Sequence, residues 1–65
     1  LNMYKGQVYK FTGNTGSIRP KEFGQSRQDV LFKNIEKKFK IGDKVLFTYE
    51  LQNGRCWAVV LEHDT

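Results

Sequence analysis

The residue types that carry nucleophilic and metal chemistry are scarce in this chain of 65 residues. It contains one cysteine, Cys56, and one histidine, His63. A thiol nucleophile needs a base beside it and a structural zinc site needs several ligands, so neither residue makes a site alone. Strand alternation places Cys56 in the core, and His63 lies close to the chain end, where fraying is common. The sequence therefore predicts no enzyme activity, no metal site and no cofactor.

Basic and aromatic residues could do a different chemistry, because phosphates attract cations and nucleobases stack on rings. The chain has 11 Lys and Arg residues against 7 Asp and Glu residues, which gives a net charge of +4, and 14% of its residues are aromatic. A charge of this size spread evenly over a small domain only aids solubility. The positions of the cations must decide whether the chain binds a polyanion.

The length predicts a single small domain over residues 1–65, with its folded part over residues 3–62. Apolar runs such as residues 58–61 are far shorter than the roughly 20 residues that a membrane helix needs, and no basic segment followed by an apolar stretch indicates secretion. We expect a cytoplasmic domain without membrane contact. The opening Leu1-Asn2-Met3 suggests a segment of a longer protein.

Alternation of apolar and polar residues recurs along the chain, and no stretch of ten residues has an unbroken helical spacing. Two segments have turn chemistry, Gly13–Gly16 and the pair Asn53-Gly54. Five short strands without a helix predict an all-β fold, either a small closed barrel or a sandwich, and a barrel leaves no free sheet edge. The expected strands cover residues 5–12, 17–19, 30–33, 44–51 and 55–61.

Two connections between the strands are longer than a turn. Residues 21–28 are polar and predict a surface loop, in which Phe23 is a ring that caps one end of the barrel or stacks on a ligand. Residues 34–43 predict a solvated, lysine-rich connection with two apolar anchors, Phe39 and Ile41.

Five segments of the chain, taken in order, resemble a cold-shock domain, and the likeness covers nearly the whole chain. This family has a five-stranded antiparallel barrel of the oligonucleotide/oligosaccharide-binding (OB) fold. The resemblance implies binding of single-stranded RNA or DNA, with bases stacked on aromatic side chains of the first three strands. The segments are Lys5–Phe11, Gly16–Pro20, Asp29–Phe32, Gly42–Phe47 and Gly54–Val60.

The positions that carry stacking rings in this family have other residues here, whereas the inward positions are apolar. The resemblance thus implies the scaffold of the family without its aromatic platform. The first-strand Trp position corresponds to Lys10, the two Phe positions of the first motif to Thr15 and Ser17, and the ring positions of the second motif to Leu31, Lys33 and Asn34.

Basic residues occupy part of that platform. Alternation places Lys10, Arg19 and Lys33 outward on three neighbouring strands, and Lys5 lies nearby. Such cations contact phosphates without reading sequence, and Tyr9 can add a stacking ring if a bulge turns it outward. We therefore expect weak, sequence-tolerant binding of single-stranded RNA or DNA by an RNA-associated protein. The alternative is a set of ordinary solvated charges, with Tyr9 at the barrel end.

The last hairpin indicates a second function. If one side of this hairpin, including Ala58 and Val60, faces the core, the other side places four apolar residues outward: Leu46, Trp57, Val59 and Leu61. Exposed apolar patches mark partner surfaces, and Trp is enriched among interface hot spots. The alternative function is therefore a protein-interaction or spacer module that binds a protein partner or a neighbouring domain, unless a loop or flanking chain covers the patch.

Overall fold

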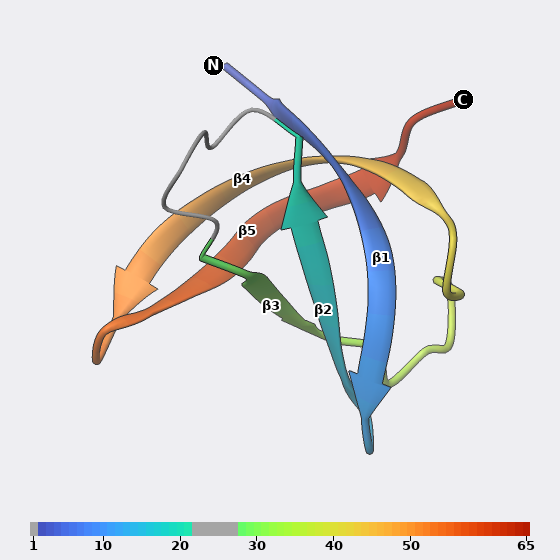
Figure 1. The fold of residues 1–65 in the computed structure, drawn as a ribbon, viewed down its shortest axis with the longest axis horizontal. Helices are drawn as coiled ribbons and strands as arrows, with labels where there is room; N and C mark the ends of the chain where they lie inside the picture. The colour runs from blue at the N-terminus through green and yellow to red at the C-terminus, as the bar shows by residue number, and fades with distance from the viewer. Residues whose placement is uncertain (1, 22–27) are drawn as a thin grey trace.

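The protein, seen here as a computed structural model, is described over residues 2–21 and 28–65, which form five strands of one sheet (Figure 1). All five expected strands are present. Phe23 lies outside the described residues, and within these residues no helix is long and apolar enough to cross a membrane. The strands are β1 (Tyr4–Thr12), β2 (Thr15–Pro20), β3 (Val30–Lys33), β4 (Lys44–Gln52) and β5 (Arg55–His63).

The sheet closes on itself because β4 pairs with both β5 and β1, which gives the barrel order β1-β2-β3-β5-β4. Four of the pairings are antiparallel, but β3 and β5 run parallel, with Val30 beside Cys56 and Leu31 beside Trp57. The expectation of a wholly antiparallel sheet is therefore wrong, and the sheet is mixed. This parallel contact brings the outer surface of β3 next to that of β5.

The core consists of apolar side chains from all five strands. Phe32 lies among other rings, with centroid distances of 5.9 Å to Phe11 and 5.5 Å to Phe39, both in edge-on geometry. Burial raises the pKa of the Cys56 thiol above its ordinary value, as expected for a core residue. The expected inward positions and Cys56 are confirmed: Val8, Ile18, Val30, Phe32, Val45, Phe47 and Cys56 are buried.

A β-bulge in β1 changes which side chains face outward. Val8 pairs with Ile18 and the next pair joins Lys10 to Ser17, so Tyr9 has no counterpart on β2. A bulge of this kind puts one extra residue in one strand. Alternation then resumes with Phe11, which packs against the core. Tyr9 and Lys10 consequently share the outer side of the barrel.

A second bulge lies in β5. Phe47 pairs with Leu61 and Tyr49 with Ala58, so Thr48 alone opposes two valines of β5. The Val60 N–H, which the bulge removes from the ladder, donates to Thr48 Oγ1 at 3.1 Å.

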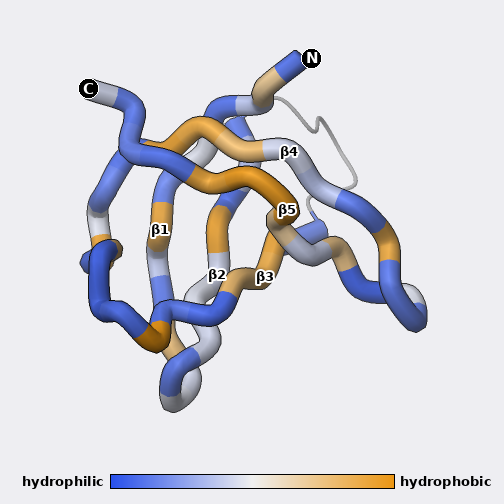
Figure 2. The backbone as a smooth tube through the Cα atoms, turned by 180° about the vertical axis from the view of Figure 1, so that it is seen from behind, coloured by the Kyte–Doolittle hydropathy of each residue, from blue (hydrophilic) through white to orange (hydrophobic). Residues whose placement is uncertain are grey.

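This bulge reverses the expected orientation of two residues. Val60 was expected to face the core but is 39% exposed, and Leu61 was expected to face outward but packs against the core. Both expectations are wrong because simple alternation does not continue through an inserted residue. The apolar stretch of β5 that contains Val60 and Leu61 is orange in Figure 2.

The connection from β3 to β4 has one apolar anchor instead of two. Phe39 packs against the core, whereas Ile41 is 65% exposed, so the expected anchoring role of Ile41 is wrong. His63 belongs to β5 and pairs with Val45, so this strand extends two residues beyond its expected end at residue 61. Both ends of the described chain lie on the same side of the barrel in Figure 1.

Gly16 is required by the packing of Phe32. A Cβ atom at this position would lie 2.8 Å from Cε1 of Phe11 and would overlap the Phe32 ring. We expect Gly16→Ala to lower the free energy of unfolding by about 1–3 kcal/mol, the usual cost of overpacking. Because the Phe32 ring is the obstacle, the cost should shrink in a Phe32→Leu background. Urea denaturation of the four proteins measures both quantities, and equal costs in the two backgrounds would contradict the assigned contact.

Candidate nucleic-acid interface

A row of outward residues crosses four neighbouring strands. Lys10 lies opposite Ser17, Ser17 lies opposite Leu31, and Leu31 lies beside Trp57. With an inter-strand spacing of about 4.8 Å, the β1 and β5 ends of this row are about 14 Å apart. Ser17 is only 5% exposed in the middle of the row. The ends of the row therefore carry its accessible groups.

Two further cations flank this row. Arg19 follows Ser17 at the next outward position of β2, and Lys33 follows Leu31 at the next outward position of β3, where it pairs with Thr15. Arg19 and Lys33 thus lie on opposite sides of the row that contains Lys10. We define the outer face as the surface formed by Tyr9, Lys10, Arg19, Lys33 and Trp57.

Tyr9 forms the β1 end of the outer face together with two cations. The Cζ atom of Arg19 lies 4.1 Å from the centre of the Tyr9 ring, and Lys10 Nζ lies 5.8 Å from it. The Tyr9 hydroxyl donates a hydrogen bond to Asp29 Oδ2. This bond is the main reason that the Tyr9 pKa lies above its ordinary value, so the phenol stays neutral at physiological pH. Tyr9 is an outward ring with one face occupied by a guanidinium group.

Trp57 forms the β5 end of the outer face. Its side chain is half-buried, and Lys33 Nζ lies 5.5 Å from the centre of its ring. The same ammonium group donates to Thr15 Oγ1 at 3.1 Å. The sequence interpretation assigned Trp57 to a separate apolar patch, but the structure joins it to the basic residues. The outer face therefore has a ring with an adjacent cation at each end.

Other expected site residues lie elsewhere. Lys5 pairs with Leu46 across the β1–β4 contact, and Lys5 Nζ lies 3.5 Å from Asp64 Oδ2. Leu46 in turn lies opposite Glu62. Lys5 and Leu46 are thus neighbours of one another and not of the outer face.

The expected apolar patch has a different composition in the structure. Val59 is 59% exposed and lies on the same strand as Trp57, whereas Leu61 packs against the core. Val60 is exposed in place of Leu61. What remains of the patch is a short apolar stretch of β5 next to the outer face.

A groove of about 540 Å³ opens beside Trp57, between β5 and the segment that follows β3. Its lining combines apolar residues of both segments with three charged residues, Lys33, Glu36 and Lys38. The apolar lining includes Ile35, Phe39 and Val59. Sequence reasoning missed this groove because it depends on the path of the β3–β4 connection, which carries no regular pattern.

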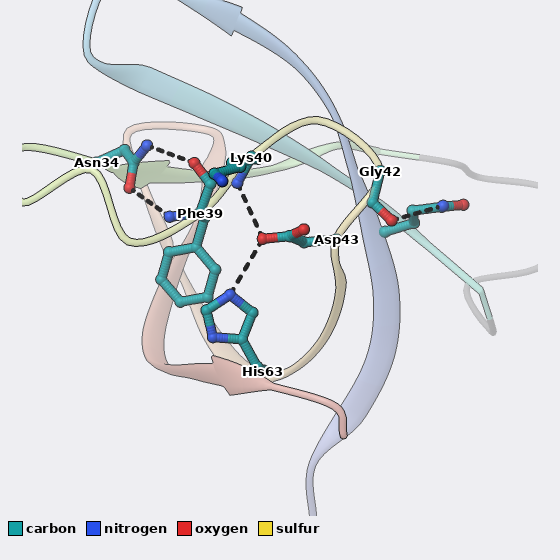
Figure 3. Close-up of polar contacts among 7 residues, drawn as sticks. Asn34, Phe39, Lys40, Gly42, Asp43 and His63 are labelled. Carbon is teal, nitrogen blue, oxygen red and sulfur yellow. Dashed lines mark hydrogen bonds and ion pairs between the residues drawn. The ribbon is translucent and has the colours of Figure 1, made fainter.

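Hydrogen bonds hold the wall of the groove in place, as Figure 3 shows. Asn34 Nδ2 donates to the Phe39 carbonyl at 2.9 Å, and the Phe39 N–H donates to Asn34 Oδ1 at 3.2 Å. The His63 ring stacks on Phe39 with 4.4 Å between centroids. Asp43 Oδ2 accepts from the Lys40 N–H at 3.0 Å and lies 3.1 Å from His63 Nε2. Phe39 is thus held through its backbone by Asn34 and through its ring by His63, which in turn contacts Asp43.

The same connection also supports the bulge of β1. The Gly42 N–H donates to the Val8 carbonyl at 2.8 Å, and the Val8 N–H donates to the Asp43 carbonyl at 2.9 Å. Gln7 Nε2 donates to the Gly42 carbonyl at 2.9 Å. Gly42 has φ of 96°, a conformation that favours glycine. The connection thus links the groove to the strand that turns Tyr9 outward.

Comparison with protein-family models, with curated proteins and with solved structures finds no match for this chain. Among residues 2–21 and 28–65, no group of three or more His, Cys, Asp or Glu side chains could hold a metal ion. The functional inference therefore depends on the geometry of the outer face and the groove.

Asp43 should make the stability of the protein depend on acid pH. Its pKa lies below the ordinary aspartate value, chiefly because its carboxylate accepts the Lys40 N–H and secondarily because it lies beside His63. The resulting stabilisation is present above the ordinary pKa and is lost as pH falls through the lower folded value. Asp43→Asn should therefore flatten the decrease in unfolding free energy between about pH 5 and pH 2.

Urea denaturation of the native chain and of Asp43→Asn across this pH range measures the effect. Glu36→Gln removes a carboxylate from the same connection and is the control for net charge. If the unfolding free energy of the native chain and that of Asp43→Asn decrease equally as pH falls, Asp43 does not hold this wall through its charge.

Proposed function

We propose that this chain is a diverged cold-shock-like domain of the OB fold that binds single-stranded RNA or DNA weakly and without sequence preference. It acts as a non-catalytic module of an RNA-associated protein. The observation that carries this proposal is the presence of two rings, Tyr9 and Trp57, on one face with a cation near each ring. A polyanion with stacking bases is the ligand that matches both features.

The stacking contribution of this face is limited by its small number of rings. Stacking on an aromatic side chain is worth about 1–3 kcal/mol per base. Arg19 covers one face of Tyr9, so a base at that end stacks on the guanidinium plane or displaces it. Trp57 has the larger ring and lies beside the groove. We expect Trp57 to contribute more than Tyr9.

Phosphate contacts supply the remainder of the affinity. Lys10, Arg19 and Lys33 would release counterions, with a slope of about 0.7 per phosphate in a plot of log affinity against log salt for a single strand. Glu50 pairs with Trp57 on the β4 side, and its carboxylate repels phosphates there. The charges thus favour a path over β1, β2 and β3 to Trp57.

A protein-interaction or spacer module is the second candidate. It is favoured by the exposed valines that follow Trp57 on β5, Val59 at 59% and Val60 at 39%. The cation beside Trp57 is the reason to rank it below nucleic-acid binding, since interface cores are depleted of lysine.

Titration of a labelled single-stranded oligonucleotide, followed by fluorescence anisotropy at two salt concentrations, tests the proposed function. Trp57→Ala should weaken binding roughly 5- to 150-fold, the equivalent of one stacked base. Trp57→Phe keeps a ring and should lose less. Lys33→Ala should reduce the salt slope by about 0.7.

Lys44→Ala is the charge-matched control, because Lys44 pairs with Gln7 on the β1–β4 side of the barrel. It should change the affinity less than Lys33→Ala does. Absence of binding at low salt would overturn the proposed function and leave the second candidate. That candidate would be contradicted if Trp57→Ala left protein association of the full-length protein unchanged.

A further inference from the structure

The groove beside Trp57 is open to solvent next to the outer face but is built from other residues. One wall is β5 and the other is the segment that follows β3. Ile35 is 70% exposed and Val59 is 59% exposed, so each wall has an aliphatic group in contact with water. Phe39 and Leu61 pack against the core and contribute apolar lining. Exposed apolar groups that face a shared hollow mark a site for an apolar or flat ligand.

Charge around the groove selects among such ligands. Lys33 and Lys38 both line it, and Lys33 also belongs to the outer face. Glu36 Oε1 lies 3.3 Å from Lys38 Nζ, but both side chains are more than half exposed, so this pair is weak and a phosphate can compete for the ammonium group. The lining thus joins apolar walls to two lysines and one carboxylate, Glu36, and its net positive charge complements a base attached to a phosphate.

The groove is also pre-formed. The side-chain amide of Asn34 is engaged by the backbone of Phe39 through both its donor and its acceptor. The ring of Phe39 is also stacked against the ring of His63. A ligand does not have to order this wall when it binds, which reduces the cost of binding.

From these observations we infer that the groove binds one unstacked nucleobase of the strand that lies on the outer face. The base inserts between Ile35 and Val59 beside Trp57, and the phosphate next to it pairs with Lys33 or Lys38. The volume of about 540 Å³ lies within the range of about 300–1,000 Å³ for small-molecule sites and has room for a purine or a pyrimidine. Recognition is by shape and burial, without base preference. This inference rests on the proposed function, since it assigns an additional contact to the same strand.

The test compares an intact thymidine oligonucleotide with one of the same length in which every base is absent. The ratio of their two dissociation constants measures the part of the affinity that depends on bases, whatever the register of binding. In the double variant Ile35→Ala/Val59→Ala, this ratio should fall about fivefold or more, the low end for one base. Affinity for the abasic strand should stay unchanged, because both lysines are still present.

Two further variants complete the design. Leu51→Ala removes a 66% exposed aliphatic side chain of β4 and should leave the ratio unchanged. Lys38→Ala should weaken both oligonucleotides by a similar factor, as expected for a phosphate contact. All these substitutions are at exposed positions, so the variants are expected to fold.

The outcomes separate the two proposals. If the intact oligonucleotide binds but the ratio is the same in Ile35→Ala/Val59→Ala as in the native chain, the groove does not hold a base, and binding on the outer face stands. If neither oligonucleotide binds at low salt, both the groove inference and the proposed function are wrong. Trp57, the single tryptophan of the chain, is quenched by a base on the outer face or in the groove, so weaker quenching by the intact strand in Ile35→Ala/Val59→Ala supports the groove, and equal quenching contradicts it.

Discussion

The strict alternation of side chains along a β-strand, and its interruption at two bulges, determines what this small barrel presents to solvent. Each inserted residue exchanges inside and outside for the residues after it. In β1 the insertion leaves both Tyr9 and Lys10 outward between the inward residues Val8 and Phe11, and in β5 it exposes Val60 and returns Leu61 to the core. In β5 the Val60 N–H has a partner in Thr48, and in β1 the backbone of Val8, next to the bulge, is bonded to the β3–β4 connection. Both insertions add an apolar or aromatic residue to the outside of the barrel.

Strands and core positions were predictable from the sequence because both follow local rules. Alternation predicts the buried residues of each strand, and Asn53-Gly54 adopts the positive φ values of 52° and 79° expected for a hairpin turn of this type. The errors concern Val60, Leu61 and the direction of β5 relative to β3. A bulge and a parallel pairing depend on how the whole sheet closes. A short segment of sequence does not contain that information. The same limit applies to the groove, since its two walls are far apart in sequence.

Three of the expected site cations lie on the outer face, but their ring partners were only partly predictable. A bulge near Tyr9 was a stated condition for its outward position, and the register of β1 meets this condition. The place of Trp57 in the same face depends on the β3–β5 contact. Residue types alone divided the surface into a basic part and an apolar part. In the structure, Lys33 belongs to both, because its ammonium group lies near the Trp57 ring while its strand carries the basic row.

Contacts within the free protein limit how tightly the outer face can bind. Cation–ring contacts at exposed sites are worth about 0.5–1 kcal/mol each, and a base that stacks on Tyr9 or Trp57 must share or replace them. Against a stacking gain of about 1–3 kcal/mol per base, the net contribution of each ring is small unless the displaced cation moves to a phosphate. Arg19 and Lys33 are long side chains that can make this exchange, which keeps the charge contact while the ring accepts the base. The contributions of rings and cations to the affinity are therefore coupled. High salt weakens the contact between the displaced cation and the phosphate, and this contact is what offsets the loss of the cation–ring contact when a base stacks.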